Sequence, residues 1–461
     1  MQLLFYILRN IFLIMRRIFK EYIAKTAIII TVKGARIKRK GKKKMCKSKE
    51  SLKEMLYAVY GEGTRNLARF TVLERQLKTE FNAEGAEYFT APGRTEIIGN
   101  HTDHNGGKVL AASIGMDTIA AAWPNHSECV IVRSQGFSQP FVLDLGHLDA
   151  VPEGDGTLSL LAGIFRGCRT LGFKVEGFYA CISTEVISAA GVSSSASFEM
   201  LICAIINRFF NEGRMSCLDY AKIGQYSEHH YWKKQSGLMD QLACAVGGAV
   251  FLDFSDKENP VVEKLTLPLE QEGYQIILVN TGKGHGNLSR EYSEIPSEMK
   301  KAASCLGKQQ LSDTSLESLL IEAPAIRQTC GDRSLLRAIH FFEENRRVDD
   351  AREALGQSNI PVFLSLVSQS GNSSWKYLQN CCVPSEPAEQ SVSVMLALTE
   401  LFLAKIGKGA CRVHGGGFAG VIMCILPREA ADVYREYISA YAGCDNVFPV
   451  TIRSQGAIHL G

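Results

Sequence analysis

Several common signatures of metal-binding and nucleotide-binding proteins are missing from this chain of 461 residues. Its fourteen cysteines form no CxxC pair and no Cys/His cluster at zinc spacing, which argues against the usual structural zinc sites. Several cysteines lie in apolar runs, and this favours reduced thiols in a cytoplasmic protein. A GxxxxGK[ST] phosphate loop is absent, and we expect no GxGxxG turn placed after a strand. A nucleotide would therefore need another kind of phosphate-binding loop.

The first 44 residues differ sharply from the rest in charge. They contain thirteen Lys and Arg against a single acid, Glu21, for a net charge of +12, although the whole chain carries +3. Arg9 interrupts their apolar part too early for a membrane span of about 20 residues, and no small-residue cleavage site follows. A basic, apolar helix can lie on a membrane surface. We favour the simpler interpretation that translation begins near Met45 or Met55 and that residues 1–44 are not part of the fold.

Length and composition predict a globular protein of two domains. A chain of this length exceeds what one core usually organises, and 46% hydrophobic with 21% charged residues is ordinary for a globular protein. The hydrophobic pattern breaks into Asp, Ser, Glu, Asn and Pro around residues 253–260, so we expect domains at 45–260 and 261–461. The chain after residue 44 carries about −9, which argues against nucleic acid as a partner. We expect small-molecule ligands, no stable membrane insertion, and a monomer or weak homo-oligomer.

Hydrophobic periodicity predicts a mixture of helices and strands. In the first half, helical spacing predicts helices over 52–81, 217–230 and 239–245, and short apolar runs predict strands at 87–90, 108–112, 118–123, 129–135 and 177–186. In the second half, helices are predicted across 297–369 and 389–406, with strands at 275–279, within the Gly-rich unit 410–426, and at 448–452.

The most informative segment is a serine-rich turn that opens onto a helical pattern. Its sequence is Gly191-Val192-Ser193-Ser194-Ser195-Ala196, followed by Phe198, Leu201, Ile202, Ile205 and Phe209. A helix start leaves N–H groups unpaired, its dipole adds partial positive charge, and small residues let a triphosphate approach the backbone. We therefore predict that Gly191, Ser193, Ser194, Ser195 and Ala196 bind ATP. The alternative is that the serines only cap the helix.

Three further segments carry chemically useful residues: PGRTEIIGNHTDHNGG from Pro92 to Gly107, SGLMDQ from Ser236 to Gln241, and GGGFAG from Gly415 to Gly420. Together with the serine turn, and in this order, they resemble the galactokinases of the GHMP kinase family from about Glu84 to the C-terminus. The resemblance implies a two-domain α+β fold, with a ribosomal S5-like N-terminal domain, a ferredoxin-like C-terminal domain and the active site in the interdomain cleft. It implies MgATP-dependent phosphorylation of the anomeric 1-hydroxyl of α-D-galactose, giving galactose 1-phosphate and ADP.

The resemblance also implies catalytic and metal-binding roles. Asp240, at the start of a predicted helix where the dipole favours a carboxylate, corresponds to the residue that orients the anomeric hydroxyl and takes up its proton. Arg94 would keep Asp240 ionised and stabilise charge at the γ-phosphate. Ser195 and Glu228, the latter three helical turns before Asp240, match the ligands of Mg²⁺. Asp240 could otherwise be a helix cap, and Glu228 a solvated helix residue.

The sugar-binding residues are expected in three places: the PGRTEIIGNHTDHNGG segment, the SGLMDQ segment and, in the second domain, the neighbourhood of Tyr292. His101 and Asp103 lie two apart on what reads as one strand-like face, which can hold hydroxyl groups, and the resemblance assigns Asp103 to the 3- and 4-hydroxyls. Gly237 lies in the SGLMDQ segment. Tyr292 matches a tyrosine that contacts the sugar in the family, although it could instead be a buried core tyrosine. The glycines at 415–420 are expected to support the phosphate loop, or to serve tight turns alone.

Two positions depart from the galactokinase pattern. Asn100 stands where galactokinases usually have Glu, and His104 where they have Tyr; Ser236 also replaces a cysteine. The family glutamate accepts a bond from the 6-hydroxyl, whereas an amide also donates and carries no charge. We therefore expect Asn100 to bind the substrate, and Asn100→Glu to shift preference toward galactose. The alternatives are a sugar 1-kinase for galacturonate or an N-acetylhexosamine, and a non-catalytic sensor of galactose and ATP.

Overall fold

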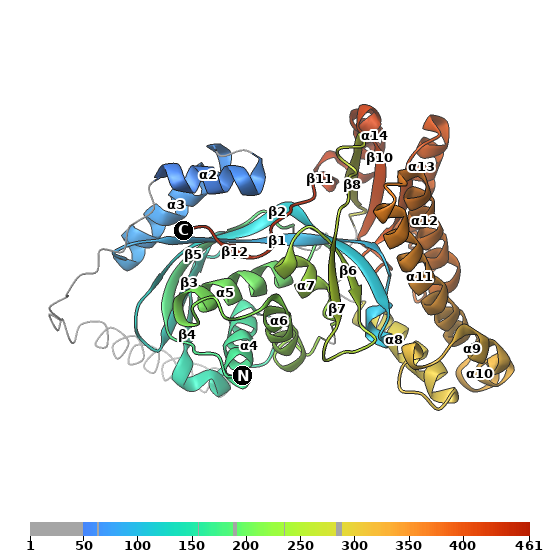
Figure 1. The fold of residues 1–461 in the computed structure, drawn as a ribbon, viewed down its shortest axis with the longest axis horizontal. Coiled ribbons are helices and arrows are strands. Elements are labelled where there is room, and N and C mark those ends of the chain that lie inside the picture. Colours follow the sequence, from blue (N-terminus) through green and yellow to red (C-terminus); the bar gives the residue numbers. More distant parts are fainter. Residues whose placement is uncertain (1–48, 62–63, 155, 188–190, 235, 283–287) are drawn as a thin grey trace, which may run out of the picture. The chain divides into compact units, whose positions relative to one another are not determined.

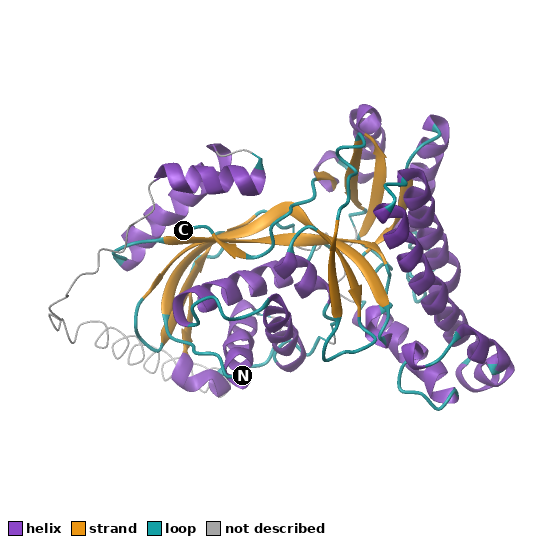
Figure 2. Ribbon diagram, viewed as in Figure 1, coloured by secondary structure: helices purple, strands orange, loops and turns teal. Residues whose placement is uncertain are grey.

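The computed structural model describes residues 49–61, 64–154, 156–187, 191–234, 236–282 and 288–461 (Figure 1). The predicted extension, residues 1–44, lies outside this range. Two β-sheets, one larger than the other, organise the described residues, and helices cover both of them (Figure 2). The chain is therefore of the α+β class that the sequence predicts.

The first sheet and its helices come mainly from the first half of the chain. The elements are α2 (Lys49–Tyr60), α3 (Thr64–Phe81), β1 (Glu87–Ile98), the 3₁₀ turn η1 (Asp103–Asn105), β2 (Lys108–Pro124), β3 (Cys129–Ser134), β4 (Phe141–Asp144), η2 (Leu145–Ala150), α4 (Thr157–Thr170), β5 (Phe178–Thr184), α5 (Ser194–Phe210), α6 (Cys217–His230), α7 (Met239–Val246), β6 (Ala249–Asp253) and β7 (Val261–Leu265).

The second sheet and a long helical region follow. The elements are β8 (Tyr274–Asn280), α8 (Ser289–Cys305), η3 (Leu311–Asp313), α9 (Leu316–Ile321), α10 (Ala323–Cys330), α11 (Asp332–Gly356), α12 (Ile360–Ser373), the π turn η4 (Ser374–Leu378), α13 (Ser391–Ile406), β9 (Ala410–His414), β10 (Val421–Pro427), α14 (Arg428–Ala442), η5 (Cys444–Asn446), β11 (Val447–Val450) and β12 (Ile458–His459).

Helices cover both faces of the first sheet, whose strand order is β12-β1-β2-β5-β3-β4, with β6 paired to β2 and β7 paired to β6 (Figure 1). Along β2, Ile119 and Ala121 belong to the apolar cluster formed with α2 and α3. Ala120 and Ala122 belong instead to the cluster formed with α4, α5 and α6. Because successive strand residues point to opposite faces, a strand covered on both sides needs apolar residues at every position, and this explains the run 119–122.

The second sheet is antiparallel, in the order β11-β8-β10-β9, and is covered in the same way. Ile276 and Leu278 of β8 pack with α11 and α12. Ile277 and Val279 of the same strand pack with α13 and α14. The period of two therefore directs neighbouring residues of β8 into two different cores.

The change from the first sheet to the second occurs between β7 and β8, later than the predicted boundary. Asp253 pairs with Val261, so the polar segment 253–260 is the turn of the β6–β7 hairpin. A division after residue 260 would cut this hairpin. Polar turn-forming residues are common both in hairpin turns and in linkers, and the pattern alone does not separate the two.

Two predicted elements differ from the structure for local reasons. The single helix predicted over 52–81 is divided between α2 and α3, because Gly61 adopts a left-handed φ of 68° directly after α2. Two short predicted strands are one long strand, β2, which continues through Asp117. That carboxylate is buried, and Arg69 and Arg453 donate to it at 2.9 and 3.0 Å. A buried ion pair thus allows a charge in a strand centre that the sequence pattern marks as a break.

The loop after β1 is fixed by a buried carboxylate from α11. Glu344 accepts the backbone N–H of Gly99 at 3.0 Å and the Nε–H of Arg347 at 2.8 Å. Burial would raise the pKa of this carboxyl, but His340, Arg347 and Arg412 hold it at about 2. The second half of the chain therefore holds the start of the β1–β2 loop in place.

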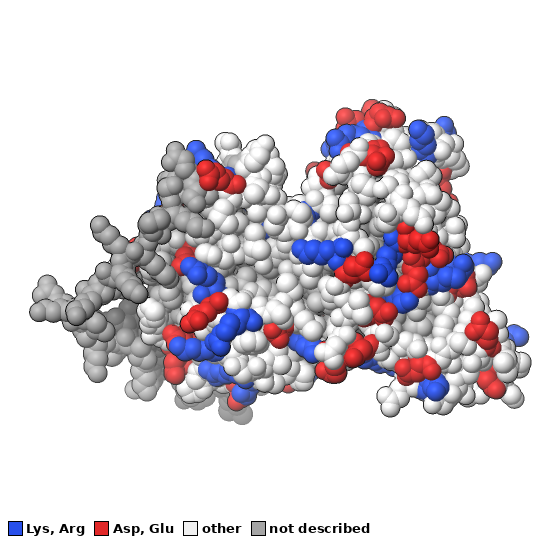
Figure 3. Space-filling model, in the orientation of Figure 1, with Lys and Arg blue, Asp and Glu red and all other residues white. Residues whose placement is uncertain are grey.

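A helix that crosses a bilayer must be both long and apolar. None of the helices in the described part of the chain combines these two properties. On the face drawn in Figure 3, Lys and Arg side chains are interspersed with Asp and Glu.

The Glu344 contacts predict a destabilised and less acid-sensitive variant. We expect Glu344→Gln to lower the free energy of unfolding by about 3 kcal/mol at neutral pH, because it leaves Arg347 buried without its counter-charge. A depressed carboxyl pKa stabilises the fold above the unfolded value and is lost as the pH falls through the folded value. In the wild type this stabilisation should therefore fade between about pH 4.5 and pH 2, and the variant should lack that part of the pH dependence.

Urea denaturation at a series of pH values would test this prediction. The matched control is Glu343→Gln, because Glu343 pairs with Arg346 at the surface, where both side chains retain solvent exposure. We expect that control to change stability by no more than about 0.5 kcal/mol. Equal stability of the two variants would contradict the role given to Glu344.

Candidate active site

The ion pair between Arg94 and Asp240 joins three separate segments of the chain. Arg94 lies on β1 and Asp240 in the first turn of α7; the arginine Nε and Nη2 are 2.8 and 2.7 Å from Asp240 Oδ1. The other arginine terminus, Nη1, donates to the carbonyl of Gly191. Ser193 Oγ donates to Asp240 Oδ2. Strand, serine turn and helix therefore meet at one carboxylate.

The electrostatics keep this pair ionised. Burial would raise the pKa of Asp240, but the charges of Arg94 and Lys234, with the bond from Ser193, hold it below its usual value. Burial would lower the pKa of Arg94, but Asp240 and then Glu96 outweigh this and raise it. The Asp240 side chain keeps about a quarter of its surface exposed (26%), whereas Arg94 keeps 7%. Asp240 is thus a charged carboxylate with one side open.

The serine turn begins α5 without capping it. Ser193 takes a left-handed conformation, with φ 57° and ψ 62°, and its side chain makes no cap bond to its own helix. Its hydroxyl is committed to Asp240 instead. The alternative that the serines serve only as caps therefore loses support for Ser193. Gly191, Ser194 and Ser195 are partly exposed, whereas Ala196 is buried beneath them.

Glycines bring the neighbouring segments close to this turn. A Cβ on Gly93 would lie 2.8 Å from the carbonyl of Val192, so β1 approaches the turn at a distance that only glycine permits. A Cβ on Gly415 would lie 3.7 Å from the carbonyl of Gly191. The glycine loop therefore lies beside the serine turn, as the sequence predicts.

The glycine loop also corrects one expectation. Gly415–Gly420 matches GxGxxG and does follow a strand, β9, although we expected no such placement. It continues into β10 rather than into a helix. Without a helix start after it, the loop lacks the unpaired N–H groups that make this motif bind phosphate in dinucleotide-binding proteins.

Ser195 and Glu228 lie in contact, as a shared metal site requires. Ser195 Oγ donates to Glu228 Oε1 at 2.9 Å. Glu228 is near the end of α6 and Asp240 begins α7, so they are not turns of one helix as the spacing suggested. Mg²⁺ binds hard oxygen ligands, usually one or two carboxylates together with phosphate oxygens. A carboxylate and a hydroxyl beside a phosphate-binding turn fit that chemistry.

Two groups to which the sequence analysis gave no role complete this part of the site. Lys234 donates to Glu228 Oε1 at 2.7 Å. Gln241, directly after Asp240, donates to the buried Glu199 at 3.1 Å and lies 3.4 Å from Glu228. Burial, with the charge of Glu228, raises the pKa of Glu199 well above its usual value.

The predicted sugar residues lie in a turn between β1 and β2 rather than on a strand. His101 has a left-handed φ of 59°, and Asp103 begins the 3₁₀ turn η1. His101 Nε2 is 2.9 Å from the carbonyl of Gly416. Burial and the neighbouring His104 lower the pKa of His101 to about 3. Because a carbonyl only accepts, the proton of the neutral ring lies on Nε2, and Nδ1 remains an acceptor.

The contact between Asp103 and Gly237 brings the PGRTEIIGNHTDHNGG and SGLMDQ segments together. A Cβ on Gly237 would lie only 1.8 Å from Asp103 Oδ2, so a side chain there would displace the carboxylate. Asp103 Oδ1 accepts the backbone N–H of His104 at 3.0 Å, and His104 Nε2 lies 3.7 Å from the same oxygen. The side chains of Asp103 and His104 keep 10% and 22% of their surface exposed. Both therefore reach the site surface.

Asn100 does not lie where the sequence predicts. Its side chain has no exposed surface. Its Nδ2 donates to Glu96 at 2.9 Å and to the carbonyl of Gly415 at 2.7 Å, and its Oδ1 accepts from Asn380 at 2.7 Å. The amide is fully bonded within the protein and offers no free group to a sugar. We therefore withdraw Asn100 as a substrate-binding residue and assign it a structural role.

Tyr292, near the start of α8, packs against the glycine loop. Its hydroxyl donates to the carbonyl of Gly417 at 3.1 Å, and its ring meets that of Phe418 edge-on, with centroids 5.5 Å apart. A Cβ on Gly416 would lie 2.2 Å from the Tyr292 ring. The tyrosine is thus partly buried but adjacent to the loop that contacts His101.

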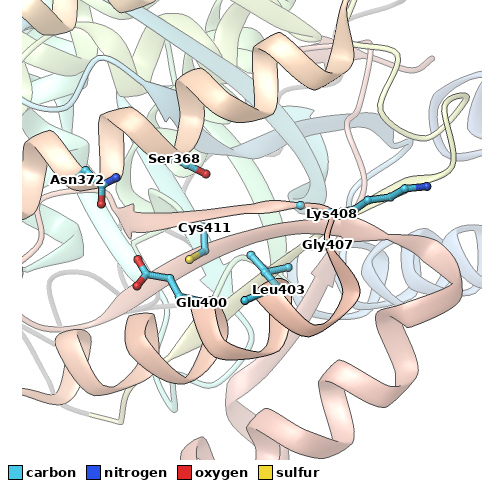
Figure 4. A pocket seen from close by; sticks show the side chains of 9 residues that line it. Ser368, Asn372, Glu400, Leu403, Gly407, Lys408 and Cys411 are labelled. Atoms are coloured by element: carbon cyan, nitrogen blue, oxygen red, sulfur yellow. The ribbon is translucent and has the colours of Figure 1, made fainter.

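A separate cavity of about 500 Å³ lies between α12, α13 and β9, away from these residues. In Figure 4, Ser368 and Asn372 of α12 lie opposite Glu400 and Leu403 of α13, with Cys411 of β9 between them. None of the residues predicted to bind sugar, ATP or metal lines it. The clustered motif residues, rather than this cavity, therefore define the candidate site.

Sequence reasoning missed the residues that support the site from other segments. They are Glu96, Lys234, Glu344, Asn380 and Arg412. Each is isolated in the sequence, and only the fold brings it to a motif. Glu96 is the exception, because it lies inside the PGRTEIIGNHTDHNGG segment beside the apolar residues Ile97 and Ile98, and a charge that becomes buried needs a partner.

The position of Asn100 predicts that a carboxylate will not be tolerated there. In Asn100→Glu, a second carboxylate would lie beside Glu96 with no exposed surface, and the donor to Gly415 would be lost. We expect Tm to fall by several degrees, because a buried like-charge pair is strongly unfavourable. Thermal unfolding would measure this, with Asn372→Glu on the exposed side of α12 as the control. Wild-type stability of Asn100→Glu would restore the view that residue 100 faces solvent or substrate.

Comparison with known proteins places these motifs in a family. Residues 76–124 match the galactokinase galactose-binding signature, and residues 159–248 match the N-terminal domain of GHMP kinases. A galactokinase of Lacticaseibacillus paracasei is 30% identical over 403 residues, which cover 83% of this chain and 97% of that protein. A galactokinase of Lactococcus lactis is 29% identical over 363 residues, covering 76% of this chain and 86% of its own length.

Solved structures agree with these matches in fold. A crystal structure of Lactococcus lactis galactokinase complexed with galactose superposes with a TM-score of 0.72 at 24% identity, covering 84% of this chain and 98% of that one. Mevalonate kinase of Methanococcus jannaschii superposes with a TM-score of 0.56 at 15% identity, covering 80% and 99%. The fold is therefore the GHMP kinase fold, and the chain belongs to the galactokinase family.

Proposed function

We propose that this protein phosphorylates the anomeric 1-hydroxyl of α-D-galactose with ATP, giving galactose 1-phosphate and ADP. The observation that carries this proposal is the single carboxylate, Asp240, that contacts both Arg94 on β1 and Ser193 of the serine turn. A base, a fixed cation and a helix start suited to phosphate meet at one point. That combination suits transfer of a phosphoryl group to a hydroxyl.

Asp240 is the residue that receives the sugar hydroxyl. Its depressed pKa means that the carboxylate is ionised at neutral pH and can accept a hydrogen bond from the hydroxyl and take up its proton. Arg94 holds the carboxylate in place and supplies positive charge beside the serine turn. Because phosphoryl transfer needs little covalent help, this positioning and charge supply most of the rate.

The serine turn and the start of α5 bind the triphosphate. Gly191, Ser193, Ser194, Ser195 and Ala196 provide small side chains and backbone N–H groups at a helix start, where the dipole favours anions. Ser195 and Glu228 would hold Mg²⁺, whose role when bound is to neutralise charge on the phosphate oxygens. The buried Glu228 is held by its contact with Ser195.

The sugar would lie between the segment Pro92–Gly107 and the segment Ser236–Gln241. Asp103 accepts bonds from hydroxyls, and Gly237 leaves the space that its carboxylate occupies. His101 offers a neutral ring nitrogen, and Tyr292 contacts the same glycine loop as His101. The 6-position is not contacted by Asn100, so its recognition falls to other residues.

The position of His104 favours one alternative substrate. Its imidazole lies beside Asp103 at the site surface, and when protonated it could pair with a sugar carboxylate. Galacturonate is therefore the alternative substrate that a specific residue favours. A non-catalytic sensor is disfavoured, since Arg94, Asp240 and the full serine turn are all present in contact.

The role given to Asp240 predicts that its replacement impairs turnover but not ATP binding. We expect Asp240→Asn to reduce turnover by at least about 100-fold, because the amide can accept a bond but cannot take up the proton. ATP affinity should change little, since the serine turn remains. Measured kcat and calorimetric ATP binding would test this, with the exposed Asp432→Asn as a control. Retained turnover would remove Asp240 from the mechanism.

The substrate prediction is tested by ADP release from the full chain with MgATP. Galactose, galacturonate, glucose, N-acetylgalactosamine and N-acetylglucosamine form the panel, and we expect the highest kcat/KM on galactose. Activity confined to galacturonate would make His104 the specificity residue and would overturn the choice of galactose. Silence on every sugar, with ATP and galactose still bound, would indicate a sensor.

A further inference from the structure

A lysine that belongs to none of the recognised motifs lies within the candidate site. Lys234 Nζ is 2.7 Å from Glu228 Oε1, the same oxygen that accepts the hydroxyl of Ser195 at 2.9 Å. The Glu228 side chain keeps 1% of its surface exposed, whereas that of Lys234 keeps 50%. The ammonium therefore reaches a buried carboxylate from the open side of the site.

The segment that carries Lys234 is held in a defined path. The backbone N–H of Lys234 donates to the carbonyl of Glu228 at 3.0 Å, directly at the end of α6. Two residues later, the carbonyl of Ser236 accepts from Gln225 at 3.1 Å and lies 2.7 Å from His229 Nε2. These bonds hold the backbone of Lys234 and of Ser236 against α6.

The preceding lysine provides a contrast within the same segment. Lys233 has a left-handed φ of 57°, which turns the chain between the two residues. Its ammonium pairs with Glu153 at 3.0 Å, and both side chains are more than half exposed. Two consecutive lysines therefore have different surroundings, one at the surface and one at the candidate catalytic carboxylates.

The charge around the site suggests what Lys234 contacts when nucleotide is bound. Phosphoryl transfer spreads negative charge over the equatorial oxygens of the moving group, and cations stabilise it. Arg94 supplies one cation on the Asp240 side, and Lys234 supplies another on the Glu228 side. A metal ion that takes Glu228 would compete with the lysine for the same oxygen. The four-carbon stem of a lysine lets its ammonium turn to a neighbouring acceptor.

We propose that Lys234 is a phosphate-contacting catalytic residue, whose ammonium holds Glu228 before nucleotide binds and contacts the γ-phosphoryl oxygens of bound ATP during transfer. This inference rests on the proposed function, since it requires ATP at the serine turn. The competing explanation is structural: Lys234 only neutralises Glu228. The two explanations differ in whether the γ-phosphate is recognised.

The test compares Lys234→Met with Lys233→Met in the full chain. We expect Lys234→Met to lower kcat about 100-fold, as loss of one preorganised charge does elsewhere, with little change in KM for the sugar. Calorimetry with ATP and with ADP, each with Mg²⁺, should show a smaller preference for ATP over ADP than in the wild type. Lys234→Arg should recover part of both losses, and Lys233→Met should match the wild type.

A structural role would give a different pattern. Lys234→Met would then keep kcat and the ATP-to-ADP preference, and half-maximal activity would need less Mg²⁺ because Glu228 is freed; this result would overturn the proposal. Unfolding of both Lys234 variants would overturn it as well, since the lysine would then serve the fold.

Failure of the proposed function would look different again. If the wild type phosphorylates no sugar in the panel, but its ATP-to-ADP preference still depends on Lys234, the substrate is wrong and the lysine assignment stands. If the wild type is active on galactose and Lys234→Met equals Lys233→Met, the function stands and the lysine assignment fails.

Discussion

The contact between Arg94 and Asp240 is the interaction on which the rest of the site depends. The two residues are 146 positions apart, and the guanidinium also donates to the carbonyl of Gly191. One arginine thereby fixes the distance between β1, the serine turn and α7. A lysine could not make these contacts in the same way, because it lacks the planar fork that reaches a carboxylate and a carbonyl together.

The second constraint is the buried polar network beneath the loop between β1 and β2. Glu96 accepts from Asn100 at 2.9 Å and from Arg412 at 3.0 Å, and Arg412 also donates to the carbonyl of Ile97. The backbone carbonyl of Asn100 lies 2.9 Å from His340 Nε2. The strand and loop that present His101 and Asp103 are therefore held by side chains of the second half of the chain. Such networks stabilise only when nearly every group is satisfied, so they specify one geometry.

The network also explains why sequence reasoning failed at residue 100. Position within a motif predicts what a residue contacts only if the surrounding residues keep their usual character. Here an acidic residue at position 96 lies four positions before the amide and binds it, and Arg412 balances the acid from β9. Arg412 cannot be inferred from the local pattern, since it is 316 residues from Glu96 along the chain. The sequence alone therefore suggests that Asn100 changes the substrate specificity, whereas in the structure Asn100 belongs to a buried hydrogen-bond network.

Local chemistry, by contrast, was sufficient for much of the fold. The apolar periodicity of the sequence correctly predicts the helices α6 and α7 and the strand β8. The serine turn precedes α5, as predicted. The predictions differ from the structure in two places. The predicted strands 108–112 and 118–123 leave out residues 113–117, where Asp117 lies within β2 and is paired with arginines distant in sequence. Residues 253–260 are predicted to be a domain boundary, because a hairpin turn has the same composition as a linker.

Charge balance gives a further reason for the arrangement of the site. Two acidic groups, Asp240 and Glu228, pair with two basic groups, Arg94 and Lys234, and burial raises the pKa of Glu199 and so favours its uncharged form. The protein side of the site is thus close to neutral, and a triphosphate would bring several negative charges into it. The helix dipole at α5 supplies only about half a charge. We therefore infer that an additional cation would accompany the nucleotide, and the oxygen atoms of Ser195 and Glu228, which lie in contact, are the groups proposed to share it.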